Sequence, residues 1–89
     1  MKKVLMFYLP TCPFCQEAFA MVEQLKQNNT AYATIEIETI DEKANAELAD
    51  QYDYYYVPTY YVDGEKLHEG IPSEEAIEAV LKAALIPKA

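Results

Sequence analysis

Two cysteines separated by two residues lie between a short apolar run and a helical pattern, and this arrangement limits the possible folds more than any other feature of the sequence. Cys12 and Cys15 are the only cysteines in the chain. The apolar run 3–8 precedes them and is typical of a buried strand. Pro13 stands where a helix would begin, a position at which its missing N–H costs nothing. The sequence therefore predicts two thiols at the N-terminal end of a helix, which is a redox arrangement.

Length, composition and charge exclude several classes of function. A chain of 89 residues allows one small domain, which we expect to span residues 1–89. The net charge is −8, whereas nucleic acids and anionic membrane surfaces are bound by clustered Lys and Arg. We therefore expect neither of them as a partner. The N-terminal apolar run is too short for a signal peptide, so we expect a cytoplasmic protein, where paired cysteines are reactive or metal-binding rather than structural.

The hydrophobic pattern of the first half predicts a strand, a helix, a strand and a second helix. Apolar residues recur at helical spacing from Pro13 to the Asn pair at 28–29. Residues 32–38 alternate between apolar and polar in the manner of a strand. Residues 39–42 (Thr-Ile-Asp-Glu) fit a capping box, so the second helix should follow directly.

The second half predicts a hairpin and a final helix. Asp63 and Gly64 form a strong two-residue turn signal between two strands. Ser73 is expected to cap the third helix, and Pro87 to end it. The whole order is β-α-β-α-β-β-α. We expect an α/β fold with a four-stranded mixed sheet and helices on both faces, because the first two strands should be parallel and the last two antiparallel.

With these elements placed, the chain resembles the thioredoxin-like superfamily in its compact glutaredoxin-type form. The likeness rests on the CPFC motif at 12–15, on Val57-Pro58 before the third strand, and on Gly70 after the hairpin. It covers essentially the whole chain and implies a thiol–disulfide oxidoreductase. It also implies a cis peptide bond before Pro58. In that geometry Val57 would offer backbone groups to an extended substrate, and Pro58 would keep stray metal away from the cysteines.

The positions of the two cysteines predict different roles for them. Cys12 should lie beside the free N–H groups and the positive end of the helix dipole, both of which favour its thiolate. We expect Cys12 to be the nucleophile and Cys15, one turn further and more buried, to be the resolving thiol. Tyr8 could border the pair or simply pack at the end of its strand. The residues expected to shape the site are Tyr8, Pro13, Phe14, Val57, Pro58 and Thr59.

Departures from both subfamilies bear on the electron donor. Leu9 stands where glutaredoxins usually carry a lysine, and residues 69–72 replace their glycine pair. Phe14 breaks the Gly-Pro pattern of thioredoxins, and the chain has no tryptophan. We expect no bound cofactor and no metal, only a redox-active disulfide. Electrons would come from a reductase or from glutathione, with a reductase favoured. The expected partners are protein disulfides and that reductase, and the chain is expected to be a monomer.

Two other functions remain as alternatives. The tyrosine-rich run 52–61 could form a docking face, with about half of its rings in the core, so the chain could be a protein-binding module. Two cysteine pairs could also share a metal ion or an iron–sulfur cluster across a dimer. His68 is expected to face solvent on an edge strand, far from any catalytic role.

Overall fold

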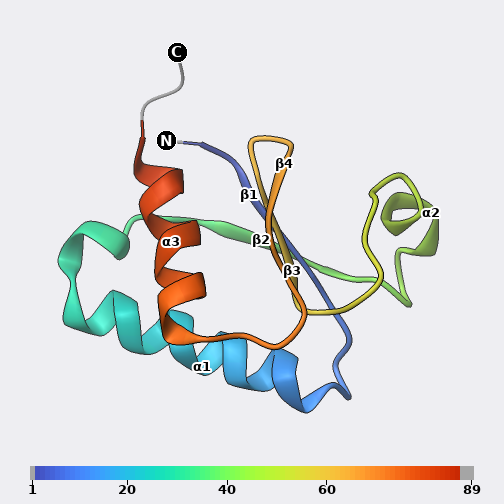
Figure 1. Cartoon of the computed structure of the whole chain (residues 1–89), viewed down its shortest axis with the longest axis horizontal. Coiled ribbons are helices and arrows are strands. Elements are labelled where there is room, and N and C mark those ends of the chain that lie inside the picture. Colours follow the sequence, from blue (N-terminus) through green and yellow to red (C-terminus); the bar gives the residue numbers. More distant parts are fainter. Residues whose placement is uncertain (1, 87–89) are drawn as a thin grey trace.

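The computed structural model describes residues 2–86, and within them a four-stranded sheet carries helices on both faces (Figure 1). The strands are β1 (Val4–Tyr8), β2 (Ile37–Asp41), β3 (Thr59–Val62) and β4 (Glu65–Glu69). The helices are α1 (Pro13–Asn28), α2 (Ala46–Ala49) and α3 (Glu74–Leu85), with a 3₁₀ turn η1 at Thr30–Tyr32. The predicted order of elements is confirmed. None of the helices in residues 2–86 is long and apolar enough to cross a membrane.

The strand order is β2-β1-β3-β4, so β1 lies inside the sheet. It pairs with β2 in parallel, with Val4 opposite Ile37, and with β3 in antiparallel, with Phe7 opposite Thr59. A parallel pair needs a long crossover connection, and α1 provides it. The hairpin β3–β4 completes a mixed sheet, as the sequence predicted.

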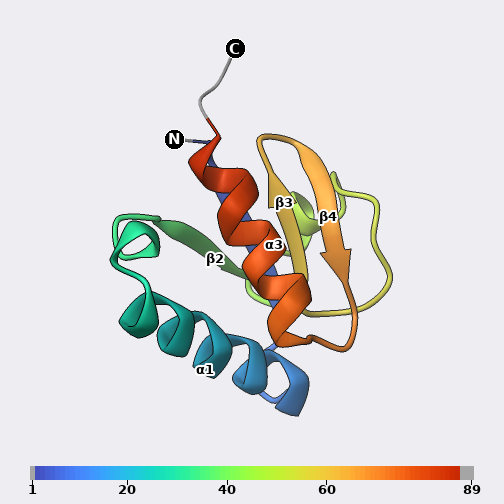
Figure 2. The same ribbon diagram turned by 60° about the vertical axis from the view of Figure 1, so that its left-hand side comes forward.

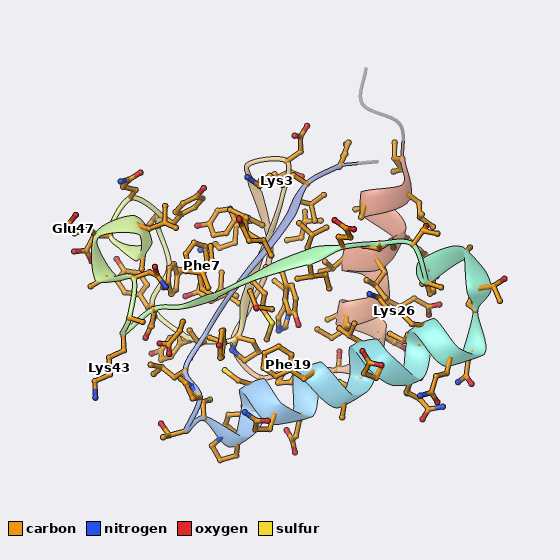
Figure 3. All side chains as sticks on the ribbon, turned by 180° about the vertical axis from the view of Figure 1, so that it is seen from behind. Lys3, Phe7, Phe19, Lys26, Lys43 and Glu47 are labelled. Atoms are coloured by element: carbon orange, nitrogen blue, oxygen red, sulfur yellow. The ribbon has the colours of Figure 1, made fainter. Side chains whose placement is uncertain are left out.

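The alternation of β1 divides the core between the two faces of the sheet. Val4 and Met6 pack toward α1 and α3 together with Tyr60. Leu5 and Phe7 pack on the opposite face, the face of α2. Figure 2 shows α1 and α3 on one side of the sheet, and Figure 3 shows Phe7 on the side toward α2. Because β1 is buried on both faces, it reads as a continuous apolar run.

The second strand lies later in the chain than its alternating pattern indicated. Tyr32 belongs to η1, and the strand begins only at Ile37. Asn29 causes the difference, because its side chain accepts a hydrogen bond from the Ala31 N–H at 3.0 Å and so starts the 3₁₀ turn. Ile35 is buried, as its place on the apolar side of the alternation predicted, whereas the burial of Tyr32 was not predicted; both residues lie outside the sheet. The prediction of a strand at 32–38 was wrong for most of its length.

The expected capping box at residues 39–42 was also wrong. Thr39 lies in β2 opposite Met6, and Ile40 is buried opposite Phe7. The carboxylate that starts the next turn belongs to Asp41, whose Oδ1 accepts from the Lys43 N–H at 3.0 Å. Turn residues follow, and α2 is a single turn that begins at Ala46.

The hairpin and the last helix are as predicted. Asp63 and Gly64 have φ values of 50° and 86°, which a turn with two left-handed residues requires. The Ser73 hydroxyl accepts from the Ala76 N–H at 3.1 Å and caps α3. The expected end of this helix at Pro87 lies outside the described residues.

Candidate active site

Cys12 is the N-cap residue of α1, directly after a tight turn. Its N–H donates to the Leu9 carbonyl at 3.1 Å, and its own carbonyl accepts from the Cys15 and Gln16 N–H groups at 3.1 and 3.2 Å. Pro13 occupies the first helical position, and the Cys12 side chain makes no capping hydrogen bond within the described part of the chain. The Phe14 N–H, for which no described residue is an acceptor, and the helix dipole therefore favour negative charge at this end of α1.

The loop that enters β3 forms the opposite wall of the site. The Val57–Pro58 peptide bond is cis, and the Cys12 thiol lies 3.9 Å from the Val57 carbonyl oxygen. Pro58 is buried, and its carbonyl accepts from the Gly70 N–H at 3.0 Å. Figures 1 and 2 show the start of α1, the loop into β3 and the turn after β4 at the same end of the sheet. Segments separated by more than forty residues thus meet around Cys12.

The two thiols differ sharply in their surroundings. Both are free in this structure; Cys12 is half-buried, whereas Cys15 is fully buried. Burial raises the pKa of the Cys15 thiol to about 11, and the neighbouring Cys12 adds to this increase, although a backbone hydrogen bond from Leu9 opposes it. Cys12 is therefore the thiol that a partner can reach. Cys15 lies behind it and stays protonated at neutral pH.

This asymmetry predicts selective alkylation. At pH 8, a thiol with a pKa of about 11 is ionised in about one molecule in a thousand. Iodoacetamide should therefore modify Cys12 first, and Cys15 should react in the native protein only as the pH approaches 11. Peptide mass spectrometry over a pH series measures both rates, with the urea-unfolded chain as the control in which both thiols react. Equal rates in the native protein would contradict this assignment.

The remaining predicted site residues are distributed around this pair. Phe14 is 41% exposed beside the cysteines, whereas Thr59 is buried and donates its hydroxyl hydrogen to the Tyr56 carbonyl oxygen. Tyr8 packs edge-on against Phe19 of α1, with the ring centroids 5.3 Å apart. Figure 3 shows Phe19 directed from α1 toward the sheet. Tyr8 was expected either to border the cysteine pair or to pack at the end of its strand. Its ring contact with Phe19 corresponds to the second of these.

An apolar hollow adjoins Cys12. It has a volume of about 360 Å³ and is lined by Phe14, Tyr56, Val57, Gly70 and Ile71. Tyr56 and Ile71 are each 70% exposed, which is unusual for large apolar side chains. The hollow is therefore an apolar surface depression beside the half-buried Cys12 thiol.

The tyrosine-rich run divides as the sequence predicted. The rings of Tyr52 and Tyr54 pack against the buried Phe7, while Tyr60 and Tyr61 lie in the two halves of the core. Exposed rings also remain; they belong to Tyr55 and Tyr56.

Three polar residues near the site have surroundings that the sequence did not reveal. The buried Tyr60 hydroxyl has no hydrogen-bond partner among residues 2–86. His68 was expected to face solvent but is half-buried, with its Nε2 3.0 Å from the Gly70 carbonyl oxygen. Glu69 contacts the loop that carries Val57. The contacts of His68 and Glu69 depend on how β4 turns back along β3, and no local sequence signal indicates them. In the described part of the chain, no group of three or more His, Cys, Asp or Glu side chains is placed to hold a metal ion.

Comparison with known proteins agrees with this geometry. The family model described as a thioredoxin domain matches residues 2–82. The chain belongs to the thioredoxin family. A thioredoxin from Methanocaldococcus jannaschii is 31% identical over 83 residues, which cover 93% of this chain and 95% of the relative. A probable thioredoxin from Methanothermobacter thermautotrophicus is 35% identical over 75 residues, which cover 83% and 86% of the two chains.

Solved structures support the same assignment. A mutant thioredoxin from Halobacterium salinarum superposes with a TM-score of 0.67 at 28% identity, over 97% of this chain and 78% of that chain. Membership of the thioredoxin family supports a thiol–disulfide oxidoreductase role for this protein. Thioredoxins use a redox-active disulfide without a bound cofactor, and they act on protein disulfides together with a reductase.

Proposed function

We propose that this protein is a small thiol–disulfide oxidoreductase that cycles the Cys12–Cys15 pair between dithiol and disulfide. The observation that carries the proposal is the asymmetry of the pair. A half-exposed thiol at a helix start faces the Val57 carbonyl oxygen at 3.9 Å, with a fully buried thiol one turn behind it. Exchange chemistry requires this combination of an accessible nucleophile and a second thiol that reacts only within the same molecule.

The reaction proceeds in two exchanges. The Cys12 thiolate attacks one sulfur of a substrate disulfide; the substrate S–S bond breaks, one substrate thiolate leaves, and a mixed disulfide forms. Cys15 then loses its proton and attacks the Cys12 sulfur, which forms the Cys12–Cys15 disulfide and releases the second substrate thiolate. Two electrons pass from the pair to the substrate, and both released thiolates take up protons from solvent. The raised pKa of Cys15 keeps it protonated until the mixed disulfide is present.

The surroundings of Cys12 suit an extended polypeptide. No described residue accepts a hydrogen bond from the Val57 N–H, so this group is open to a substrate carbonyl. Pro13 and Phe14 form the rim on the helix side, while Val57 and Pro58 form the opposite wall. Thr59 holds the loop from beneath through the Tyr56 carbonyl. Apolar side chains next to the substrate disulfide would occupy the hollow beside Phe14.

The electron donor in this proposal is a protein reductase rather than glutathione. Leu9 lacks the charge that would bind a glutathione carboxylate, and the net charge of −8 disfavours an anionic tripeptide. We also propose that the protein acts in the cytoplasm as a monomer and as one domain over residues 1–89. In this scheme Pro58 keeps stray metal from the cysteines.

A reduction assay tests the proposal. The purified protein is supplied with NADPH and thioredoxin reductase, or with NADPH, glutathione and glutathione reductase, and insulin is the protein disulfide. The proposal predicts catalysed insulin reduction, faster with the first donor system. Absence of reduction with both systems and with dithiothreitol would contradict it. A partner bound independently of redox state would then favour a binding module, and stoichiometric metal after anaerobic purification would favour a cluster-sharing dimer.

A further inference from the structure

Residues 53–57, which we call the Val57 loop, lead from the turn after α2 to the wall of the active site. Regular secondary structure does not hold this loop, because α2 ends at Ala49 and β3 begins at Thr59. Side-chain hydrogen bonds to the sheet and to the turn after β2 hold it instead. The Tyr61 hydroxyl donates to the Asp53 carbonyl at 2.7 Å, and the Tyr54 hydroxyl donates to the Glu42 carboxylate at 2.7 Å. These contacts fix the first half of the loop.

Glu69 holds the second half of the loop. Its Oε2 accepts hydrogen bonds from two consecutive backbone groups, the Tyr55 N–H and the Tyr56 N–H, the latter at 2.9 Å. These N–H groups belong to the two residues immediately before Val57. The Glu69 side chain is only 18% exposed, so water competes weakly for its oxygens.

Lys66, on the same strand, contacts both Glu69 and the loop. We call these two side chains, with their contacts to the Val57 loop, the clamp. The Lys66 ammonium group lies 2.7 Å from Glu69 Oε1 and 3.1 Å from the Asp53 carbonyl oxygen, so it contacts both the carboxylate and the start of the loop. Lys66 and the two N–H groups lower the pKa of the Glu69 carboxyl to about 2. Glu69 therefore remains ionised at any pH at which the protein would work, and the clamp is permanently charged.

The clamp lies beside the site because of the β3–β4 pairing. Glu69 is opposite Thr59 in the sheet, and the next residue, Gly70, donates its N–H to the Pro58 carbonyl. The end of β4 thus contacts the chain on both sides of Val57. Glu69 accepts hydrogen bonds from the two residues before Val57, and Gly70 donates one to Pro58 after it. A shift of this strand end would move the Val57 carbonyl oxygen away from Cys12.

We infer that Glu69 is a positioning residue, and that its contacts with Lys66 and the Val57 loop hold the Val57 backbone against Cys12 for extended polypeptide substrates. The inference rests on the proposed function. It makes Glu69 important for protein disulfides, which need the backbone groups of Val57. Small disulfides need only the Cys12 thiolate and should not depend on Glu69.

The test compares Glu69→Ala and Glu69→Gln with Glu65→Ala, an exposed glutamate of the same strand. For Glu69→Ala we expect KM for insulin to rise about tenfold, because two charge-assisted hydrogen bonds are lost. The rate toward a small disulfide, dithiobis(nitrobenzoate), should stay within twofold of that of the unmodified chain. Glu69→Gln keeps an acceptor oxygen, so its effect should be smaller. Glu65→Ala should change neither rate.

Amide hydrogen exchange provides a readout that is independent of activity. In Glu69→Ala the Tyr55 and Tyr56 amides should exchange faster, while those of β1 remain protected. An insulin KM within twofold of the unmodified chain, an equal loss toward both disulfides, or unchanged exchange at both tyrosines would overturn the inference. If Glu69→Ala does not fold, Glu69→Gln decides: faster exchange at Tyr55 and Tyr56 with a raised insulin KM supports the inference, and unchanged exchange at both tyrosines or an unchanged insulin KM overturns it. An unmodified chain that reduces no disulfide contradicts the proposed function instead, and amide exchange then still reports whether the clamp exists.

Discussion

Replacement of Cys12 by serine should abolish disulfide reduction, with a loss of more than about a thousandfold in the insulin assay, because a serine hydroxyl is not ionised at neutral pH and cannot replace a thiolate. Replacement of Cys15 by serine should have a different outcome. Cys12 can still attack the substrate, but the buried thiol that would release it is absent, so a mixed disulfide should accumulate.

Mass spectrometry of the quenched reaction distinguishes the two variants. Cys15→Ser should carry one substrate chain attached to Cys12, and a reductant should remove it. Cys12→Ser should carry none, and circular dichroism should show both variants folded. A Cys12→Ser variant that keeps a tenth or more of the activity, or substrate attached to Cys15 rather than to Cys12, would reverse the assigned roles.

Replacement of Phe7 by alanine should lower the free energy of unfolding by about 3–5 kcal/mol. Phe7 is completely buried on the α2 face of the sheet, and its ring centroid lies 4.8 Å from that of Tyr52, 4.9 Å from that of Tyr54 and 6.0 Å from that of Tyr61. The substitution removes the ring against which all three tyrosines pack. For a small domain, this loss is a large part of the total stability.

Phe14→Ala is the matched control for Phe7→Ala. Its ring is 41% exposed, so the same substitution should cost about 1 kcal/mol or less. Urea unfolding followed by tyrosine fluorescence or circular dichroism measures both variants. Losses of equal size in the two variants would show that the aromatic cluster around Phe7 does not carry the stability assigned to it.

The parts of the fold that local patterns specify were predictable. The run 3–8 is apolar on both faces because β1 is an inner strand, and the Asp63-Gly64 turn needs left-handed residues that few other pairs supply. The prediction misplaced the second strand because apolar and polar residues alternate over 32–38 although most of these residues do not pair with another strand. Its register is decided by pairing with β1, which places Ile40 opposite Phe7, and by the Asn29 side chain that starts η1.

The candidate site was predictable only in part. The motif at 12–15 and Pro13 placed both thiols at a helix start without knowledge of the fold. The position of Val57 opposite Cys12 required the family resemblance, because 45 residues separate the two. Glu69 was missed because its direction depends on the irregular pairing of β3 with β4 between Tyr60 and Tyr61, a feature that has no signature in the sequence.

A redox titration decides whether Cys12 and Cys15 form a dithiol–disulfide couple. The purified protein is equilibrated in glutathione buffers and in dithiothreitol buffers of graded potential, quenched with acid and alkylated, and the Cys12–Cys15 disulfide is measured by mass. We expect a reversible two-electron transition between dithiol and intramolecular disulfide, with the same midpoint from the oxidised and the reduced side. A protein that forms no intramolecular disulfide at any potential would contradict this expectation.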